Sequence, residues 1–213
     1  MRKLCLLFLL IGTYCYAGEK KYTVDSPDGK IQLAIIQTDA GELTYQLSVK
    51  HKQVIDASAL GFKTEDGLTF PFRGWKMGKV TRNKVNSVWK PLWGKRAVVP
   101  DKYNEMKLSF VNEAKSSDAL EVVARAYNEG VAFRYVSPQD AGSALELTTF
   151  NFAGDYTAWF YNGERHNIGP ERLTEPDGER LPVMTVKAAD DLYLAVHEAC
   201  LDDCLLCTSP SPR

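Results

Sequence analysis

The chain has 213 residues, of which 45% are hydrophobic, 11% aromatic and 25% charged. This composition is typical of a globular protein and excludes an intrinsically disordered chain. Twenty-six basic residues against 27 acidic ones give a net charge of −1, so the basic excess expected of a nucleic-acid-binding protein is missing.

Residues 1–17 are typical of a secretory signal peptide. Two basic residues precede an apolar run, Leu4–Ile11, and the segment ends in a small residue, Ala17. The run is well short of the roughly 20 apolar residues that a membrane-spanning helix needs. We therefore predict cleavage after Ala17 and a secreted or periplasmic protein without a membrane span. Lipid attachment at Cys15 is the alternative.

The first predicted strands follow directly. The turn sequence SPDGK (residues 26–30) leads into an alternating strand at 31–35, because Pro and Gly both favour a turn. A second turn at 39–42 leads into Leu43–Val49, where every other residue is apolar. This pattern predicts an antiparallel hairpin with one buried and one solvated face.

Short strands continue to the end of the chain, and no long stretch keeps a helical period outside the signal segment. They are predicted at 54–55, 60–64, 75–85, 88–93, 105–111, 120–127, 131–136, 144–150, 158–161, 183–186 and 192–196. The Asn-Glu-Gly sequence at 128–130 predicts a tight hairpin, and Gly163–Arg180 is predicted to be a long loop. About a dozen strands exceed one immunoglobulin-sized sandwich. We therefore predict an all-β fold, a large two-sheet β-sandwich over residues 22–203.

The C-terminal residues do not fit this fold. Cys200, Cys204 and Cys207 have the spacing of an iron–sulfur motif, but too little chain follows to enclose a cluster, and export disfavours one. Residues 204–213 instead resemble the translation of a sequencing adapter. We therefore expect the natural sequence to depart from this one after Asp203, and we predict no disulfide because Cys200 is then the only cysteine.

Candidate catalytic chemistry is sparse. No phosphate-binding loop, HExxH motif or nucleophile elbow is present, and no pair of acidic residues is singled out for glycoside hydrolysis. His51 is expected to be solvated, and His166 has no ligand spacing around it. Glu198 follows His197 at the end of an apolar strand, where a carboxylate could bind a hard cation such as calcium. A salt bridge at the sheet rim is the alternative, and the residues alone favour it.

Aromatic residues cluster in two places, at Trp89 and Trp93 and again at Tyr156–Trp159. Aromatic faces stack on sugar rings, which makes carbohydrate binding available. A position in the core is the alternative, and for any single Trp it is the better interpretation.

Six sequence strings together resemble the start of glycoside hydrolase family 97. They are SPDGK (26–30), WKPLWG (89–94), YNE (103–105), RAYNEGVAFRY (125–135), FNFAGDYTAW (150–159) and LAVHEA (194–199). Members of that family carry an N-terminal super-sandwich, a (β/α)8 barrel and a C-terminal β-domain, and they cleave α-linked sugars in the periplasm. The resemblance implies that this chain is the sandwich without its catalytic barrel. It would then hold no catalytic residue and be inactive alone.

The resemblance also bears on Glu198. In the glucosidase branch of the family, a glutamate in a His-Glu-Ala stretch binds calcium beside the catalytic centre, which implies that Glu198 is a calcium ligand in an intact enzyme. The partners implied are an α-linked oligosaccharide and the missing barrel of the same polypeptide. Two other hypotheses remain, a free-standing carbohydrate-binding module and a purely structural secreted sandwich.

Overall fold

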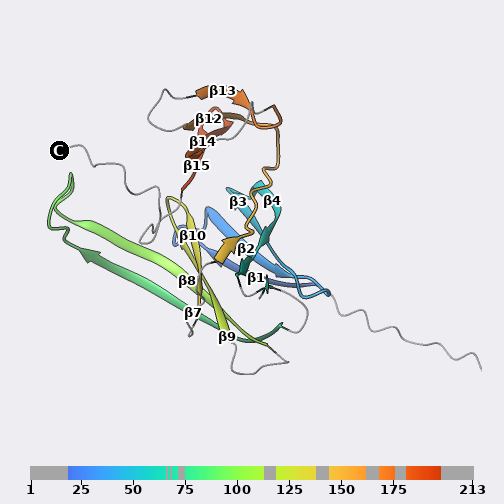
Figure 1. Cartoon of the computed structure of the whole chain (residues 1–213). Helices are drawn as coiled ribbons and strands as arrows, with labels where there is room; N and C mark the ends of the chain where they lie inside the picture. Colours follow the sequence, from blue (N-terminus) through green and yellow to red (C-terminus); the bar gives the residue numbers. More distant parts are fainter. Residues whose placement is uncertain are drawn as a thin grey trace, which may run out of the picture.

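A computed structural model describes residues 19–65, 67, 69–71, 75–112, 119–137, 144–161, 168–175 and 181–197. Within these ranges all regular secondary structure is β-strand. The described residues contain no helix that is long and apolar enough to cross a membrane. The described strands are β1 (Lys20–Asp25), β2 (Ile31–Gln37), β3 (Leu43–Val49), β4 (Lys52–Leu60), β5 (Phe62–Thr64), β6 (Thr69–Phe70), β7 (Trp75–Trp89), β8 (Val99–Asn112), β9 (Ala119–Tyr127), β10 (Val131–Val136), β11 (Ala144–Glu146), β12 (Thr157–Tyr161), β13 (Ile168–Arg172), β14 (Leu181–Ala189) and β15 (Leu192–Val196) (Figure 1).

The first sheet is an antiparallel meander in the order β1-β2-β3-β4. Gly29 in the turn between β1 and β2 has a φ of 73°, a left-handed conformation that glycine adopts without steric penalty. Leu43 and Tyr45 of β3 are buried, and Leu47 and Val49 pack against the same core from partly buried positions. The alternating face predicted for this strand is therefore confirmed.

The second sheet has the order β10-β9-β8-β7, and all its strands are antiparallel. The predicted hairpin between β9 and β10 is present, and it is closed by a 2.8 Å hydrogen bond from the amide of Tyr127 to the carbonyl of Gly130. Strands β7 and β8 are much longer than their neighbours and project beyond the sheet as an arm (Figure 1).

These two sheets enclose the main hydrophobic core. Leu33 and Ile35 of the first sheet and Met106 and Leu108 of the second are fully buried members of one cluster. Phe70 lies among the aromatic rings of this core, with ring centroids 5.2 Å from Trp75 and 5.3 Å from Phe110 in edge-to-face geometry. Burial of large side chains between two sheets is the main stabilising contribution to such a sandwich.

Two further sheets complete the described structure, one of three short strands with the order β11-β5-β6 and one of four strands with the order β13-β12-β14-β15. We call the latter the small sheet. Among the described residues, its own core contains three buried residues, Ala158, Phe160 and Val186. Phe152 and Leu194 pack against both this cluster and the main core, and so they join the small sheet to the sandwich.

The all-β prediction is confirmed: the described residues form four hydrogen-bonded sheets, of which β1-β2-β3-β4 and β10-β9-β8-β7 form the sandwich. The prediction of a long loop over Gly163–Arg180 was wrong, because β13 lies within this range and pairs with β12. Strand β1 was not predicted, and the strand predicted at 88–93 ends at Trp89. The predicted signal segment and the residues from Glu198 onward lie outside the described residues.

Candidate functional site

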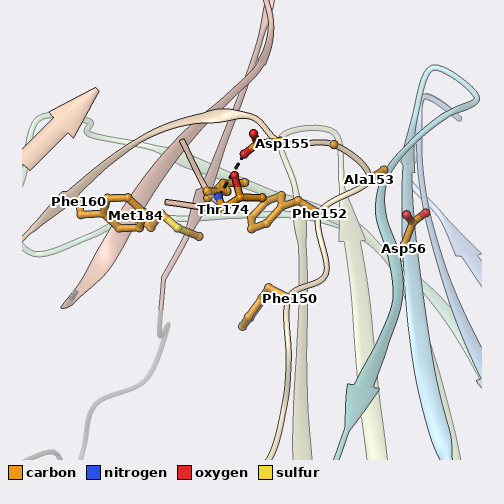
Figure 2. Close-up of a pocket in the computed structure, with 10 residues that line it drawn as sticks. Asp56, Phe150, Phe152, Ala153, Asp155, Phe160, Thr174 and Met184 are labelled. Carbon is orange, nitrogen blue, oxygen red and sulfur yellow. Dashed lines mark hydrogen bonds between the residues drawn. The ribbon is translucent and has the colours of Figure 1, made fainter. Parts of the chain in front are cut away.

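A cleft of about 650 Å³ opens between β4 of the sandwich and the small sheet. Figure 2 shows Asp56 on one side of the cleft and Phe160 and Met184 on the other. Between them runs a connecting segment, residues 147–153, that carries Phe150 and Phe152. A volume of this size lies within the range of about 300–1,000 Å³ that is typical of small-molecule sites. The lining mixes aromatic rings with a few polar groups.

The connecting segment, residues 147–153, is held along the edge of β4 although only one of its residues forms a ladder bridge, Phe152 with Ile55. Its backbone bonds run from Leu147 N to Gly61 O (2.8 Å), Thr149 N to Ala59 O (3.1 Å), Asp56 N to Asn151 O (2.7 Å) and Ala153 N to Val54 O (3.1 Å). The buried Ser58 hydroxyl accepts a further bond from the amide of Asn151 at 2.8 Å. These bonds fix the backbone from which Phe150 and Phe152 project.

An ion pair between Arg172 and Asp155 lies just after the connecting segment. The guanidinium of Arg172 on β13 donates to the Asp155 carboxylate, and the amide of Thr174 donates to the same group at 3.1 Å, as the dashed line in Figure 2 marks. Burial raises the pKa of the Asp155 carboxyl, but the hydrogen bonds from Arg172 and Thr174 outweigh that effect and hold its pKa below the ordinary value. Asp155 is therefore an anion that anchors β13.

Among the described residues, the cleft is lined by two carboxylates, and both are hydrogen-bonded within the domain. Besides the engaged Asp155, the cleft carboxylate of Asp56 accepts a 2.6 Å hydrogen bond from the side-chain amide of Gln53. Phe150 is exposed, with 40% of its surface accessible, and offers a ring face of the kind on which sugars stack. The described cleft therefore combines an exposed aromatic ring with two hydrogen-bonded carboxylates.

A second polar cluster joins three of the sequence strings singled out above. The carboxylate of Glu105, which is 6% exposed, accepts a 2.8 Å hydrogen bond from Nε of Arg125. The guanidinium of Arg125 also lies 4.3 Å from the centroid of the Tyr103 ring. Nearby, the amide of Asp28 donates to the side-chain oxygen of Asn128 at 3.0 Å, and this bond ties the SPDGK turn to the β9–β10 hairpin. Because every charge in this cluster is paired, we assign it a structural role.

The structure places the other predicted residues as follows. His51 is exposed in the turn before β4, and His197 is exposed directly after β15, while Glu198 and His166 lie outside the described residues. Among the described parts of the chain, no group of three His, Cys, Asp or Glu side chains could hold a metal ion. Trp75 is buried, but Trp89 and Trp93 are exposed, so the core interpretation is wrong for both of them.

Sequence reasoning missed the cleft itself. Asp56 and Thr174 both line the cleft, although they lie far apart in the sequence. They come close because residues 147–153 run antiparallel along β4 and so place the following residues beside Asp56. The one usable signal was the aromatic string at 150–159, which supplies five of the lining residues.

Comparison with known proteins gives a consistent picture. A family model described as Glycosyl-hydrolase 97 N-terminal matches residues 24–205. A retaining alpha-galactosidase of Bacteroides thetaiotaomicron is 23% identical over 223 residues, which cover 95% of this chain and 32% of that protein. A probable retaining alpha-galactosidase of Streptomyces bingchenggensis is 29% identical over 179 residues, which cover 80% of this chain and 28% of that protein.

A solved structure agrees with these sequence matches. A glycoside hydrolase family 97 enzyme from Pseudoalteromonas sp. strain K8, in complex with acarbose, superposes with a TM-score of 0.73 at 30% identity. The match covers 84% of this chain and 28% of that one. The chain thus spans about a third of the length of the curated relatives it matches.

Proposed function

This chain belongs to the glycosyl-hydrolase 97 N-terminal family, and on that premise we propose that it forms the N-terminal sandwich of a secreted glycosidase acting on α-linked oligosaccharides. The observation that carries the proposal is the family match over residues 24–205, together with a fold shared with the acarbose-bound Pseudoalteromonas enzyme. The two curated relatives are both named as retaining alpha-galactosidases, which supports an α-linked substrate.

Bond cleavage itself is assigned to another part of the polypeptide. Glycoside hydrolysis requires two carboxyl groups that flank one bond and are free to transfer a proton or attack the sugar. In the described residues, the cleft carboxylates and the buried Glu105 are instead engaged by Gln53, Arg172 and Arg125. The contribution proposed for this domain is therefore stability and one wall of a sugar-binding surface.

Activity assays test this division of roles. The complete enzyme encoded by the same gene should release nitrophenol from an α-galactoside or an α-glucoside, whereas the 213-residue chain should release none. Turnover by the 213-residue chain would overturn the division of roles. A complete enzyme that is inactive on both substrates, and active on a β-linked one, would overturn the proposed substrate class.

Calcium is the cofactor proposed for the complete enzyme, with Glu198 as one ligand. The described residues do not hold the ion by themselves, since they contain no cluster of three candidate ligands. Calcium takes about six to eight oxygen ligands, so Glu198 would supply only a minority of them. The 213-residue chain should therefore bind calcium weakly or not at all.

A substitution in the complete enzyme tests Glu198. Glu198→Gln keeps the shape and removes the charge, so the calcium concentration that gives half-maximal activity should rise, with folding unchanged. Glu129→Gln, in the exposed β9–β10 loop, is the matched control and should leave the calcium titration unaltered. Superimposable calcium titrations for the parent enzyme and both variants would exclude Glu198 as a calcium ligand and favour a salt bridge at the sheet rim.

The second candidate function is sugar binding by this domain alone, which the cleft beside Phe150 favours. Calorimetric titration of the 213-residue chain with an α-linked trisaccharide should then show binding that Phe150→Ala abolishes. Tyr161→Ala is a matched control, because Tyr161 is equally exposed at 41% and does not line the cleft. Equal losses in both variants, or no binding by the parent chain, would exclude this function for the cleft.

A further inference from the structure

The arm formed by β7 and β8 ends in an apolar tip that projects away from the sandwich (Figure 1). We call residues 88–98 the hairpin tip. The side chains of Leu92 and Trp93 are 101% and 88% exposed, and Val88, Trp89 and Val98 are also exposed. Large apolar side chains exposed together in one turn are typical of an interaction site, and Trp is enriched among the residues that dominate interface energies.

Nothing in the described part of the chain covers this tip. Its strand pairing ends at Trp89 and Val99, and no hydrogen bond, ion pair or ring contact joins residues 90–98 to another described residue. The string WKPLWG therefore differs from the strings around Glu105 and Asn128, whose members bond to one another within the domain. Among the described residues, the tip thus has no partner within the sandwich.

Charge restricts what the partner can be. The hairpin tip carries Lys90, Lys95 and Arg96 and no acidic residue. Over residues 75–112, nine basic residues face two acidic ones, a net charge of +7, whereas the whole chain has −1 and the rest therefore −8. A polyanion such as nucleic acid or an anionic membrane would be repelled by the remainder of the chain. A protein surface with an apolar centre and an acidic rim fits the tip better.

The tip is also shaped in advance. Pro91 fixes its own φ, and Gly94 adopts a φ of 129°, a conformation that side-chain-bearing residues rarely adopt. A turn that is already ordered loses little conformational entropy when it docks.

We propose that the hairpin tip docks the sandwich onto the remainder of its own polypeptide, the two thirds of the family chain that the match does not cover. Leu92 and Trp93 enter an apolar depression there, and Lys90, Lys95 and Arg96 face acidic side chains at its rim. The inference rests on the proposed function in one respect, because it requires that the gene encode such a remainder. The length ratio supports this, since the chain covers only 28–32% of its relatives.

Limited trypsin digestion tests the docking directly. Lys95 and Arg96 are cleavable positions in the tip, whereas Lys90 precedes Pro91 and resists cleavage. Mass spectrometry gives the cleavage rate after Lys95 and Arg96 in the 213-residue chain and in the complete enzyme. We expect cleavage to be at least about tenfold slower in the complete enzyme, which corresponds to about 1.4 kcal/mol of docking energy.

The double variant Leu92→Ser/Trp93→Ser should restore fast cleavage in the complete enzyme. Leu145→Ser is the matched control, because Leu145 is an exposed leucine on β11 away from the tip, and it should keep the protection. Equal cleavage rates in the 213-residue chain and the complete enzyme would overturn the docking. So would protection of the 213-residue chain that grows with its concentration, since a second copy would then be the partner.

The protection assay is independent of catalysis, so the two proposals can fail separately. A protected tip in an enzyme that hydrolyses no α-glycoside supports the docking and rejects the proposed substrate. An active enzyme with an unprotected tip retains the proposed function and overturns the docking.

Discussion

Gly61 lies between β4 and β5, where its backbone passes very close to Phe70. A Cβ atom at this position would lie 2.4 Å from the carbonyl oxygen of Phe70 and 3.1 Å from Cδ of Pro71. Contacts under 3.0 Å force something to shift, and here the nearest atom belongs to the backbone of a residue that is 1% exposed. Gly61→Ala must therefore displace Phe70 from the aromatic core or separate β5 from β6.

The expected loss of stability follows from two opposing effects. Overpacking of a well-packed core costs about 1–3 kcal/mol, and a clash with backbone belongs at the upper end. Replacing glycine by alanine also restricts the unfolded chain, which stabilises the protein by about 0.4–1 kcal/mol. The net destabilisation should be about 2 kcal/mol, or a fall in melting temperature of about 4–8 °C for a chain of this size.

Urea unfolding followed by far-ultraviolet circular dichroism measures this difference. Gly130→Ala is the matched control, because no heavy atom lies within 4 Å of a Cβ built there and its φ is outside the positive range. It should leave the midpoint unchanged or raise it slightly. A Gly61→Ala midpoint at or above that of the parent chain would refute the close approach of Gly61 to Phe70.

Two further predictions concern charged groups, and one concerns a buried hydroxyl. Hydrogen bonds from Ser26 and Lys30 lower the pKa of Asp28 from 3.8 to about 2. The ionised carboxylate therefore stabilises the folded state at every pH above the pKa of the unfolded chain, and this stabilisation is lost as the pH falls through about 2. The melting temperatures of Asp28→Asn and the parent chain should therefore differ at about pH 5 and converge towards pH 2, and an unchanged gap would contradict this. Glu105→Gln keeps the shape but removes the charge that Nε of Arg125 contacts at 2.8 Å, so the free energy of unfolding should fall by about 1–3 kcal/mol, with Glu129→Gln as the neutral control. Tyr45→Phe removes the 2.8 Å bond from the buried hydroxyl to the carbonyl of Thr149, and urea unfolding should show a loss of about 1 kcal/mol; no loss would mean that water replaces the hydroxyl.

The sequence predicted those elements best whose signal lies within a single strand or turn. The alternation in Leu43–Val49 and the glycine-containing loop at 128–130 are local signals, and both elements are present. Strand β13 was missed because Pro170 lies within it and cannot donate a ladder hydrogen bond. It is tolerated because β13 is the edge strand of the small sheet, a position that no local pattern reveals.

The candidate site was less predictable, because its features too depend on the arrangement of whole sheets and not on local sequence patterns. A single tryptophan gives no sign of whether its part of a strand lies inside the sandwich, as at Trp75, or runs past the end of the sandwich, as at Trp89. That difference depends on how far β7 and β8 outrun their neighbours, which is a property of the sheet and not of the residue. The cleft depends on contacts between segments far apart in the sequence, so only the aromatic string at 150–159 pointed towards it.

The small core of the β12–β15 sheet has a consequence for motion. With three buried residues in its described part, that sheet gains little from burial on its own, and its attachment through Phe152 and Leu194 supplies much of what holds it in place. Elements with few buried apolar contacts open at a lower free energy than the global unfolding of the protein. Amide hydrogens of β12 and β14 should thus exchange with solvent well before those of β8 and β9, and the width of the cleft should fluctuate with each local opening.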